Sequence, residues 1–157
     1  PSAKPTSSSP IAITRNDREV WVVNPDNDSV TVFSVDADQT TLTKVREIAV
    51  GDEPRSLAIA RNGGKVYVTN QGRGTVSVIH AHRREVEKTI EVGTEPFGSA
   101  LTPDGKKLYV ANFSSGDVSV IRTNQDQVID TIPVGPKPAA IAIAAFPNPW
   151  AGLPGTV

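Results

Sequence analysis

The chain has 157 residues and a formal net charge of −1, with acidic and basic residues interspersed. This length fits one ordinary domain, and the balanced charge gives no general reason to expect nucleic acid as a partner. The absence of cysteine excludes disulfides, thiol catalysis and Cys-based zinc sites, and no apolar run approaches the roughly 20 residues needed for membrane insertion as a spanning helix.

Residues 1–10, PSAKPTSSSP, contain proline and serine and almost nothing apolar. Such a segment is expected to be an extended, solvated linker. Neither a start methionine nor an apolar signal region precedes it, so we expect the chain to begin after a cleavage site or at a chosen boundary. A Ser/Pro/Thr tether left by a removed export signal would place the protein in the periplasm, on the cell surface or in the extracellular space.

Residues 51–92 divide into four short segments rich in Val, Ile, Thr and Tyr, at 56–60, 65–70, 75–80 and 86–92. These residue types fit the pleated, half-buried surface of a strand. The first two segments are joined by RNGG, whose Asn-Gly pair favours a tight hairpin turn. Since no segment has the apolar period of a helix, the unit is predicted to be four antiparallel strands.

The same unit occurs three times. VGDEP (50–54), VGTEP (92–96) and VGPKP (134–138) recur every 42 residues, and the first unit is longer only in its polar stretch DADQTTLTK. A period in the 40s with four strands is the size of one propeller blade. The sequence therefore predicts an all-β protein, a β-propeller with three complete four-stranded antiparallel blades. The predicted blades are residues 11–50, 51–92 and 93–134.

Residues 135–157 begin a fourth unit that does not continue. AAIAIA (139–144) predicts the inner strand of a fourth blade, but the irregular Pro/Gly-rich tail after it has neither the hairpin turn nor the aromatic strand. Three blades and one strand make an incomplete ring, because closure usually needs four to eight blades. Either the remaining blades belong to a longer chain, which we favour, or a homo-oligomer closes the ring.

The units resemble the YVTN family of β-propeller repeats, found in exported, cell-surface and surface-layer proteins of archaea and bacteria. The resemblance covers residues 11 to about 144, and departs from the family at His80 and Arg122, where Asp is common. It implies a propeller, and propellers of this family are often joined to redox domains. The matching phrases are Pro96, SALTPDG (99–105), YVAN (109–112), VSVI (118–121) and IPVG (132–135).

An aromatic residue and an asparagine recur in the second strand of every unit. Each ring is expected to fill the wedge between neighbouring blades, and each asparagine to bond its own turn backbone at the strand end. Recurrence at equivalent sites favours an architectural role over a ligand pocket. These structural repeat positions are Trp21, Asn24, Tyr67, Asn70, Tyr109 and Asn112.

No catalytic, metal or cofactor site is predicted. His80 and His82 share one face of an extended segment, a spacing that metal sites use, but no third ligand is evident. NPDNDS (24–29) lacks the glycine and the closing glutamate of a calcium loop, and the neighbouring Asp36 and Asp38 add no motif. Serine-elbow, phosphate-loop and zinc-protease motifs do not occur.

The positions that vary within the constant frame are the candidates for recognition. In the resembled family, the Gly-x-x-Pro link enters the innermost strand near the central axis. The links here read GDEPRS, GTEPFG and GPKPAA, so Arg55, Phe97 and Lys137 are the candidate channel-mouth contacts. Neutral loop variation is the alternative explanation.

Two functional hypotheses follow. The first is a non-catalytic interaction scaffold of an exported or cell-surface protein, which binds a protein or glycan partner through the channel-mouth loops. The alternative is the propeller part of a larger redox enzyme, whose cofactor and catalytic residues lie outside this segment.

Overall fold

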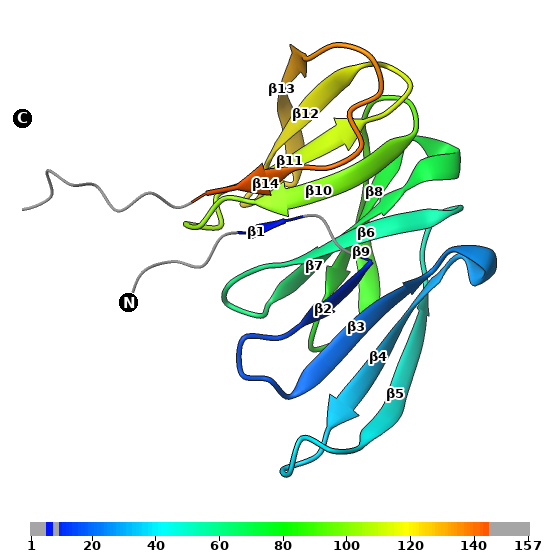
Figure 1. The fold of residues 1–157 in the computed structure, drawn as a ribbon, viewed down its shortest axis with the longest axis vertical. Coiled ribbons are helices and arrows are strands. Elements are labelled where there is room, and N and C mark those ends of the chain that lie inside the picture. The colour runs from blue at the N-terminus through cyan, green and yellow to red at the C-terminus, as the bar shows by residue number, and fades with distance from the viewer. Residues whose placement is uncertain (1–5, 8–9, 145–157) are drawn as a thin grey trace, which may run out of the picture.

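The computed structural model describes residues 6–7 and 10–144, and three four-stranded antiparallel sheets stand side by side in it as an open fan (Figure 1). The predicted all-β architecture with three complete blades in an incomplete ring is confirmed. Within the described ranges, no helix has the length and apolar character that crossing a membrane would require.

Each blade is built from four strands in chain order. The first contains β2 (Ile11–Ile13), β3 (Glu19–Asn24), β4 (Ser29–Val35) and β5 (Leu42–Ala49). The second contains β6 (Pro54–Ile59), β7 (Lys65–Asn70), β8 (Thr75–His80) and β9 (Glu85–Glu91). The third contains β10 (Pro96–Leu101), β11 (Lys107–Asn112), β12 (Asp117–Arg122) and β13 (Gln127–Pro133). Short 3₁₀ turns, η1 (Pro25–Asn27) and η2 (Gln71–Arg73), connect the second and third strands of the first two blades.

The blades share one register. Glu19 pairs with Ser34, Lys65 with His80 and Lys107 with Arg122, at the same place in each sheet. All three blades also shift register at one equivalent point between the third and fourth strands. Such irregularities increase the local twist of a sheet. Equivalent residues of different blades therefore occupy equivalent positions in space.

The core lies between blades, because alternate side chains of a strand face opposite neighbours. On β7, Val66 and Val68 pack toward the first blade, whereas Tyr67 packs toward the third. Trp21 and Tyr67 are fully buried in these two wedges, and Tyr109 on the third blade is half-buried.

The repeated asparagines do not form the hydrogen bonds to their own turn backbone that the sequence predicted. The Nδ2 atom of Asn70 donates to Thr75 Oγ1 at 3.0 Å and to Ser77 Oγ at 2.9 Å, both on the following strand. Its Oδ1 accepts the Gly51 N–H at 3.2 Å. Asn24 and Asn112 likewise donate to side chains of the next strand. Each asparagine thus joins two strands rather than closing its own turn, because hydroxyl and carboxyl acceptors project beside it.

Both ends of the fan present apolar side chains to solvent. The exposed large side chains are Ile11, Ile13, Leu42 and Val45 on the first blade and Val128, Ile129, Ile132 and Val134 on and after the last strand of the third. In a closed propeller such faces would be covered by further blades.

Short strands from the two ends of the described chain meet beside the third blade (Figure 1). The predicted inner strand at 139–144 is present as β14 (Ala142–Ile143), paired antiparallel with β1 (Thr6–Ser7). Part of the predicted linker is therefore paired, which satisfies backbone groups that β14 would otherwise leave open. The rest of that linker, residues 1–5 and 8–9, and the predicted tail at 145–157 lie outside the described residues.

Candidate binding site at the channel mouth

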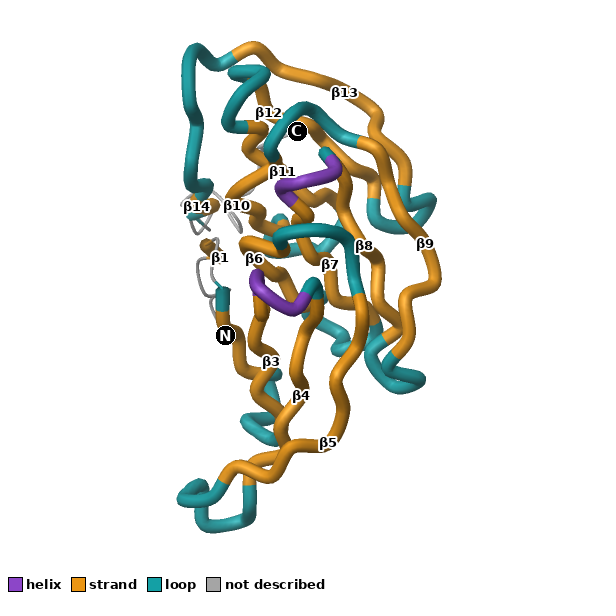
Figure 2. Tube along the Cα trace, turned by 90° about the vertical axis from the view of Figure 1, so that its right-hand side faces the viewer, coloured by secondary structure: helices purple, strands orange, loops and turns teal. Residues whose placement is uncertain are grey.

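The first strand of each blade lies toward the axis of the fan. Strands β6 and β10 pack directly against each other, as do β2 and β6, whereas the fourth strands diverge at the periphery (Figures 1 and 2). The links that lead into these inner strands, 50–54, 92–96 and 134–138, all lie at one rim. From the sequence, this rim is expected to be the mouth of a central channel.

Each link has the same backbone geometry. Glu53, Glu95 and Lys137 occupy equivalent positions and are all left-handed, with φ of 50°, 53° and 60°. In the first two links the glutamate carbonyl accepts an N–H from the turn after the second strand, Gln71 at 3.0 Å and Phe113 at 2.9 Å. The tight link therefore holds the start of the inner strand and the adjacent turn together, so that their side chains meet at the rim.

The three sequence candidates are brought together at this rim by a fourth residue, Phe113. The guanidinium carbon of Arg55 lies 5.6 Å from the centre of the Phe97 ring. Phe97 lies 5.9 Å from Phe113, with the two rings tilted by 37°. The ammonium of Lys137 lies 5.7 Å from the Phe113 ring. We call this row, Arg55–Phe97–Phe113–Lys137, the cation–aromatic ladder.

Sequence reasoning missed Phe113, although a signal was present. Phe113 stands 42 residues after Gln71, so an aromatic side chain replaces an amide in the turn of the third blade. In the second blade that amide binds the same ladder, because Gln71 Oε1 accepts a hydrogen bond from Arg55 Nε. Comparing turns as well as links would have found it.

The electrostatics of the ladder are uneven along its length. Arg55 lies 3.7 Å from the Glu53 carboxylate, so its charge is partly balanced. Lys137 has no carboxylate partner among the described residues. Aromatic faces stack against sugar rings and apolar side chains, and flanking cations attract carboxylates and phosphates. Such a row suits a glycan or an acidic protein segment.

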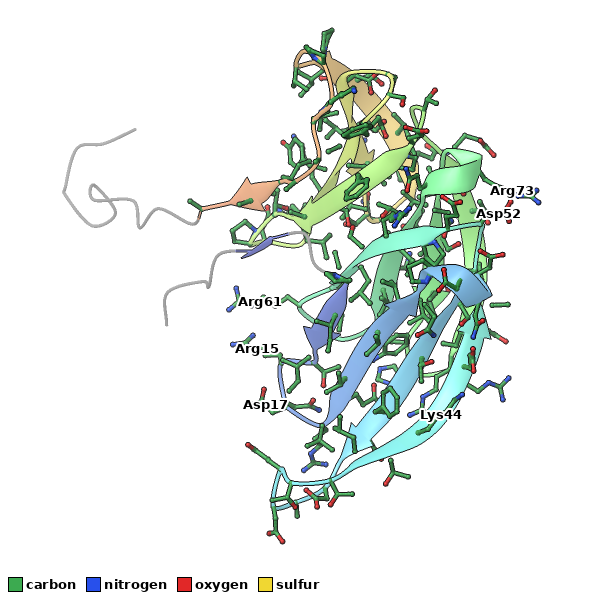
Figure 3. All side chains as sticks on the ribbon, turned by 45° about the vertical axis from the view of Figure 1, so that its right-hand side comes forward. Arg15, Asp17, Lys44, Asp52, Arg61 and Arg73 are labelled. Atoms are coloured by element: carbon green, nitrogen blue, oxygen red, sulfur yellow. The ribbon has the colours of Figure 1, made fainter. Side chains whose placement is uncertain are left out.

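Two hollows flank the second blade at opposite rims, and the labelled pairs Asp52–Arg73 and Arg15–Arg61 mark these rims (Figure 3). The smaller, of about 420 Å³, adjoins the ladder and is lined by Glu53, Gln71, Arg73 and Glu95 among others. The larger, of about 770 Å³, is lined among others by Arg15, Arg61, Tyr67 and His80. No pattern in the sequence had predicted this second hollow.

The remaining sequence candidates have ordinary structural partners. His80 Nδ1 accepts the Arg83 N–H at 3.3 Å, and its ring meets His82 edge-on with centres 6.1 Å apart. Asp28 Oδ1 accepts the Glu53 N–H at 2.9 Å, which fixes the link between the first two blades. The Thr40 N–H is the main cause that holds the pKa of the Asp36 carboxyl below its usual value. In the ranges described, no three His, Asp or Glu side chains gather in a way that could hold a metal.

Comparison with known proteins extends these observations. The family model "Lactonase, 7-bladed beta-propeller" matches residues 2–87. A search of curated proteins found no match. Hydrazine synthase of Kuenenia stuttgartiensis is 30% identical, with a TM-score of 0.73, over 82% of this chain and 36% of that one.

Two further solved structures show the same fold at lower identity. The periplasmic gluconolactonase PpgL of Pseudomonas aeruginosa is 18% identical, with a TM-score of 0.74, over 93% of this chain and 44% of that one. A protein from Lactobacillus plantarum is 12% identical, with a TM-score of 0.77, over 87% of this chain and 45% of that one. The chain thus spans less than half the length of each of the three structures.

Proposed function

The chain belongs to the lactonase seven-bladed β-propeller family, and we propose that its three blades form a ligand-binding part of a larger propeller. In this proposal the cation–aromatic ladder contacts a glycan or a protein partner at the channel mouth. The observation that carries it is the ladder itself: four side chains from two blades and the following link converge at one rim.

The ladder is suited to binding rather than to chemistry. Its members are an arginine, a lysine and two hydrocarbon rings, and it contains neither the histidine nor the carboxyl groups that most often transfer protons in catalysis. His80 lines the hollow at the opposite rim instead. A recognition role for this rim needs only the contacts that the ladder already presents.

The similarity to hydrazine synthase favours a place within a larger enzyme. The 30% identity extends over 82% of this chain but over only 36% of the matched chain of that structure. In this form of the proposal the reacting groups lie on parts of the protein outside this segment, as in the redox alternative. The YVTN character of the repeat and an exported location belong to the same proposal, and a periplasmic protein is among the solved structures of this fold.

The proposal is tested by measuring binding to an array of neutral and acidic glycans and acidic peptides. The unmodified protein and three variants are compared. Arg55→Ala and Phe97→Ala remove two members of the ladder, and Arg61→Ala, at the opposite rim, is the matched control. For any ligand that the unmodified protein binds, each ladder variant should lose about 1–3 kcal/mol of binding free energy, because aromatic and arginine contacts dominate interfaces. Equal binding by all four versions would contradict the proposal.

A second candidate is lactone hydrolysis at the larger hollow, favoured by the family match. Arg15 and Arg61 hold equivalent positions in two blades and line this hollow with His80, where they could hold the polar groups of a sugar lactone. This candidate is tested by incubating the full-length protein with gluconolactone and measuring the release of acid. Arg61→Ala should then lower the rate while Phe97→Ala leaves it unchanged, and a folded full-length protein without hydrolysis would exclude this candidate.

A further inference from the structure

A buried carboxylate joins the second and third blades. Asp126, in the turn between β12 and β13, is only 8% exposed. It accepts hydrogen bonds from the hydroxyl of Tyr67 at 2.9 Å and from the ammonium of Lys65 at 2.5 Å, both on β7 of the preceding blade. The outer turn of one blade therefore reaches back to the second strand of the blade before it. We call this contact a clasp.

The first and second blades have the same clasp with opposite charges. Arg84 stands 42 residues before Asp126 and, like it, is left-handed, with φ of 55° against 50°. Its Nη2 atom donates to Glu19 Oε1 at 2.8 Å. Glu19 takes the place of Lys65, and its other oxygen accepts a hydrogen bond from the Trp21 indole at 3.1 Å. Both clasps thus unite a turn residue, a charged strand residue and the aromatic wedge.

Opposite polarity at successive junctions specifies which blades are neighbours. Exchanging the partners would set Glu19 against Asp126, or Lys65 against Arg84, and bring like charges together in a partly buried site. Such repulsion disfavours the wrong arrangement, in addition to the attraction that favours the right one. The clasp charges therefore disfavour mispaired junctions, and an unmatched clasp residue indicates the charge that its missing partner must carry.

The third blade has an unmatched half of a clasp. Lys107 and Tyr109 stand 42 residues after Lys65 and Tyr67, in the same register. Lys107 is exposed and has no charge partner among the described residues, and Tyr109 is half-buried where Tyr67 is only 1% exposed. Glu87, which also lies 3.3 Å from Lys65, is replaced by Ile129 at the equivalent place. No acid on the third blade substitutes for the missing one.

Within the larger propeller proposed above, on which this inference rests, we propose that the blade after the third places an aspartate or glutamate of its outer turn on Lys107 and Tyr109. The surrounding face is apolar and uncovered, with Ile132 40% exposed where the equivalent Ile90 is 6% exposed. The chain beyond Pro138 enters an inner strand, β14, beside this blade. A family of seven blades, of which this chain contains three, supplies such a neighbour.

A second copy of this chain is a poorer occupant. Its first blade would have to present the outer turn at 36–41 to Lys107. In that turn the left-handed residue, at the place of Asp126, is Gln39, with φ of 57°, which carries no charge, and Asp38 stands one position before it. Asp36 is already bonded to the N–H and hydroxyl of Thr40 at 2.8 and 3.0 Å. The acid demanded by the third blade is therefore expected on a blade of a different sequence.

Zero-length carbodiimide cross-linking of the full-length protein from its source cells tests the proposal, since this reagent joins lysines to carboxylates in ion pairs. A link between Lys65 and Asp126 is the internal control. Lys107 should link to an acid in the outer turn of the following repeat. A link from Lys107 to the first blade of another copy, to an acid elsewhere, or to none while the control link forms, would overturn it.

An engineered chain gives an independent test. A second copy of residues 97–138, inserted between Pro138 and Ala139, adds a blade whose copied aspartate should meet Lys107. Two single variants of this chain are compared: Lys107→Glu, and replacement of the copied aspartate by arginine. Each alone should lower the folding equilibrium constant about tenfold, the usual range for coupled charges. Combining both should restore most of the loss, because it recreates the Glu19–Arg84 polarity. Additive losses, or proteolysis of the inserted blade alone, would overturn the proposal.

Discussion

Replacing Asp126 with alanine is expected to destabilise the protein by about 3–4 kcal/mol, because three costs combine. The variant removes the acceptor of the Tyr67 hydroxyl, which keeps only the Thr123 carbonyl at 3.4 Å. It also removes the partner of Lys65, although Glu87 remains 3.3 Å away. Hydrogen bonds to charged groups contribute about 1.5–3 kcal/mol each, and the values here lie at the low end. A left-handed alanine adds about 1 kcal/mol.

Two matched variants separate these contributions. Asp126→Asn keeps an acceptor for Tyr67 and tolerates the left-handed backbone, so its loss should be limited to about 1–2 kcal/mol. Asp126→Gly relieves the backbone and should be more stable than the alanine variant by about 1 kcal/mol. Urea unfolding, followed by tryptophan fluorescence and circular dichroism, measures all three. Equal stability of the alanine and asparagine variants, or a loss below about 1 kcal/mol for alanine, would refute the reasoning.

Two further predictions concern packing and alkaline pH. A Cβ atom at Gly93 would lie 2.6 Å from Asn112 Cγ, so Gly93→Ala should lower the free energy of unfolding in urea by about 1–3 kcal/mol. Gly64→Ala, where the new Cβ would meet no atom nearer than 3.4 Å, is the control. Equal losses of stability in the two variants would contradict the steric argument. Burial, reinforced by the carboxylate of the clasp, raises the pKa of Tyr67, so the stability it confers is complete below the free-tyrosine pKa of about 10 and is lost as the pH rises above it. In a Tyr109→Phe variant the phenolate absorbance should therefore appear only together with unfolding, and a phenolate signal in the folded state would contradict this.

The fold was predictable because its signals are local. Alternating apolar residues, Asn-Gly turns and a 42-residue interval define strands and blades without knowledge of distant partners. The burial of Trp21 and Tyr67 between blades was predictable for the same reason, since an aromatic residue that recurs on a half-buried strand packs against the neighbouring sheet. Where periodicity ended, after residue 138, the strand was shorter than expected and found a partner in Thr6–Ser7.

The hydrogen bonds and ion pairs between blades were not predictable in this way. Tyr67 and Asp126 are 59 residues apart, and Glu19 and Arg84 are 65 apart, on strands and turns that no single repeat connects. Three of the four ladder residues, Arg55, Phe97 and Lys137, were indicated by the variable links. The fourth, Phe113, depends on a left-handed link that brings a turn against the next strand. Aligning the turn positions of the three repeats, with their charges, could have revealed both the clasps and the role of Phe113.

The span of the clasp also sets an order of events during synthesis. Strands within a blade pair with their immediate neighbours in sequence, so a blade can form soon after its last strand leaves the ribosome. The Lys65–Asp126 contact joins residues 61 positions apart, and it forms only when nearly the whole following blade has emerged. The first and second blades are therefore each stabilised by the blade that follows, and a pause in translation near residue 126 would leave the second blade folded without this contact.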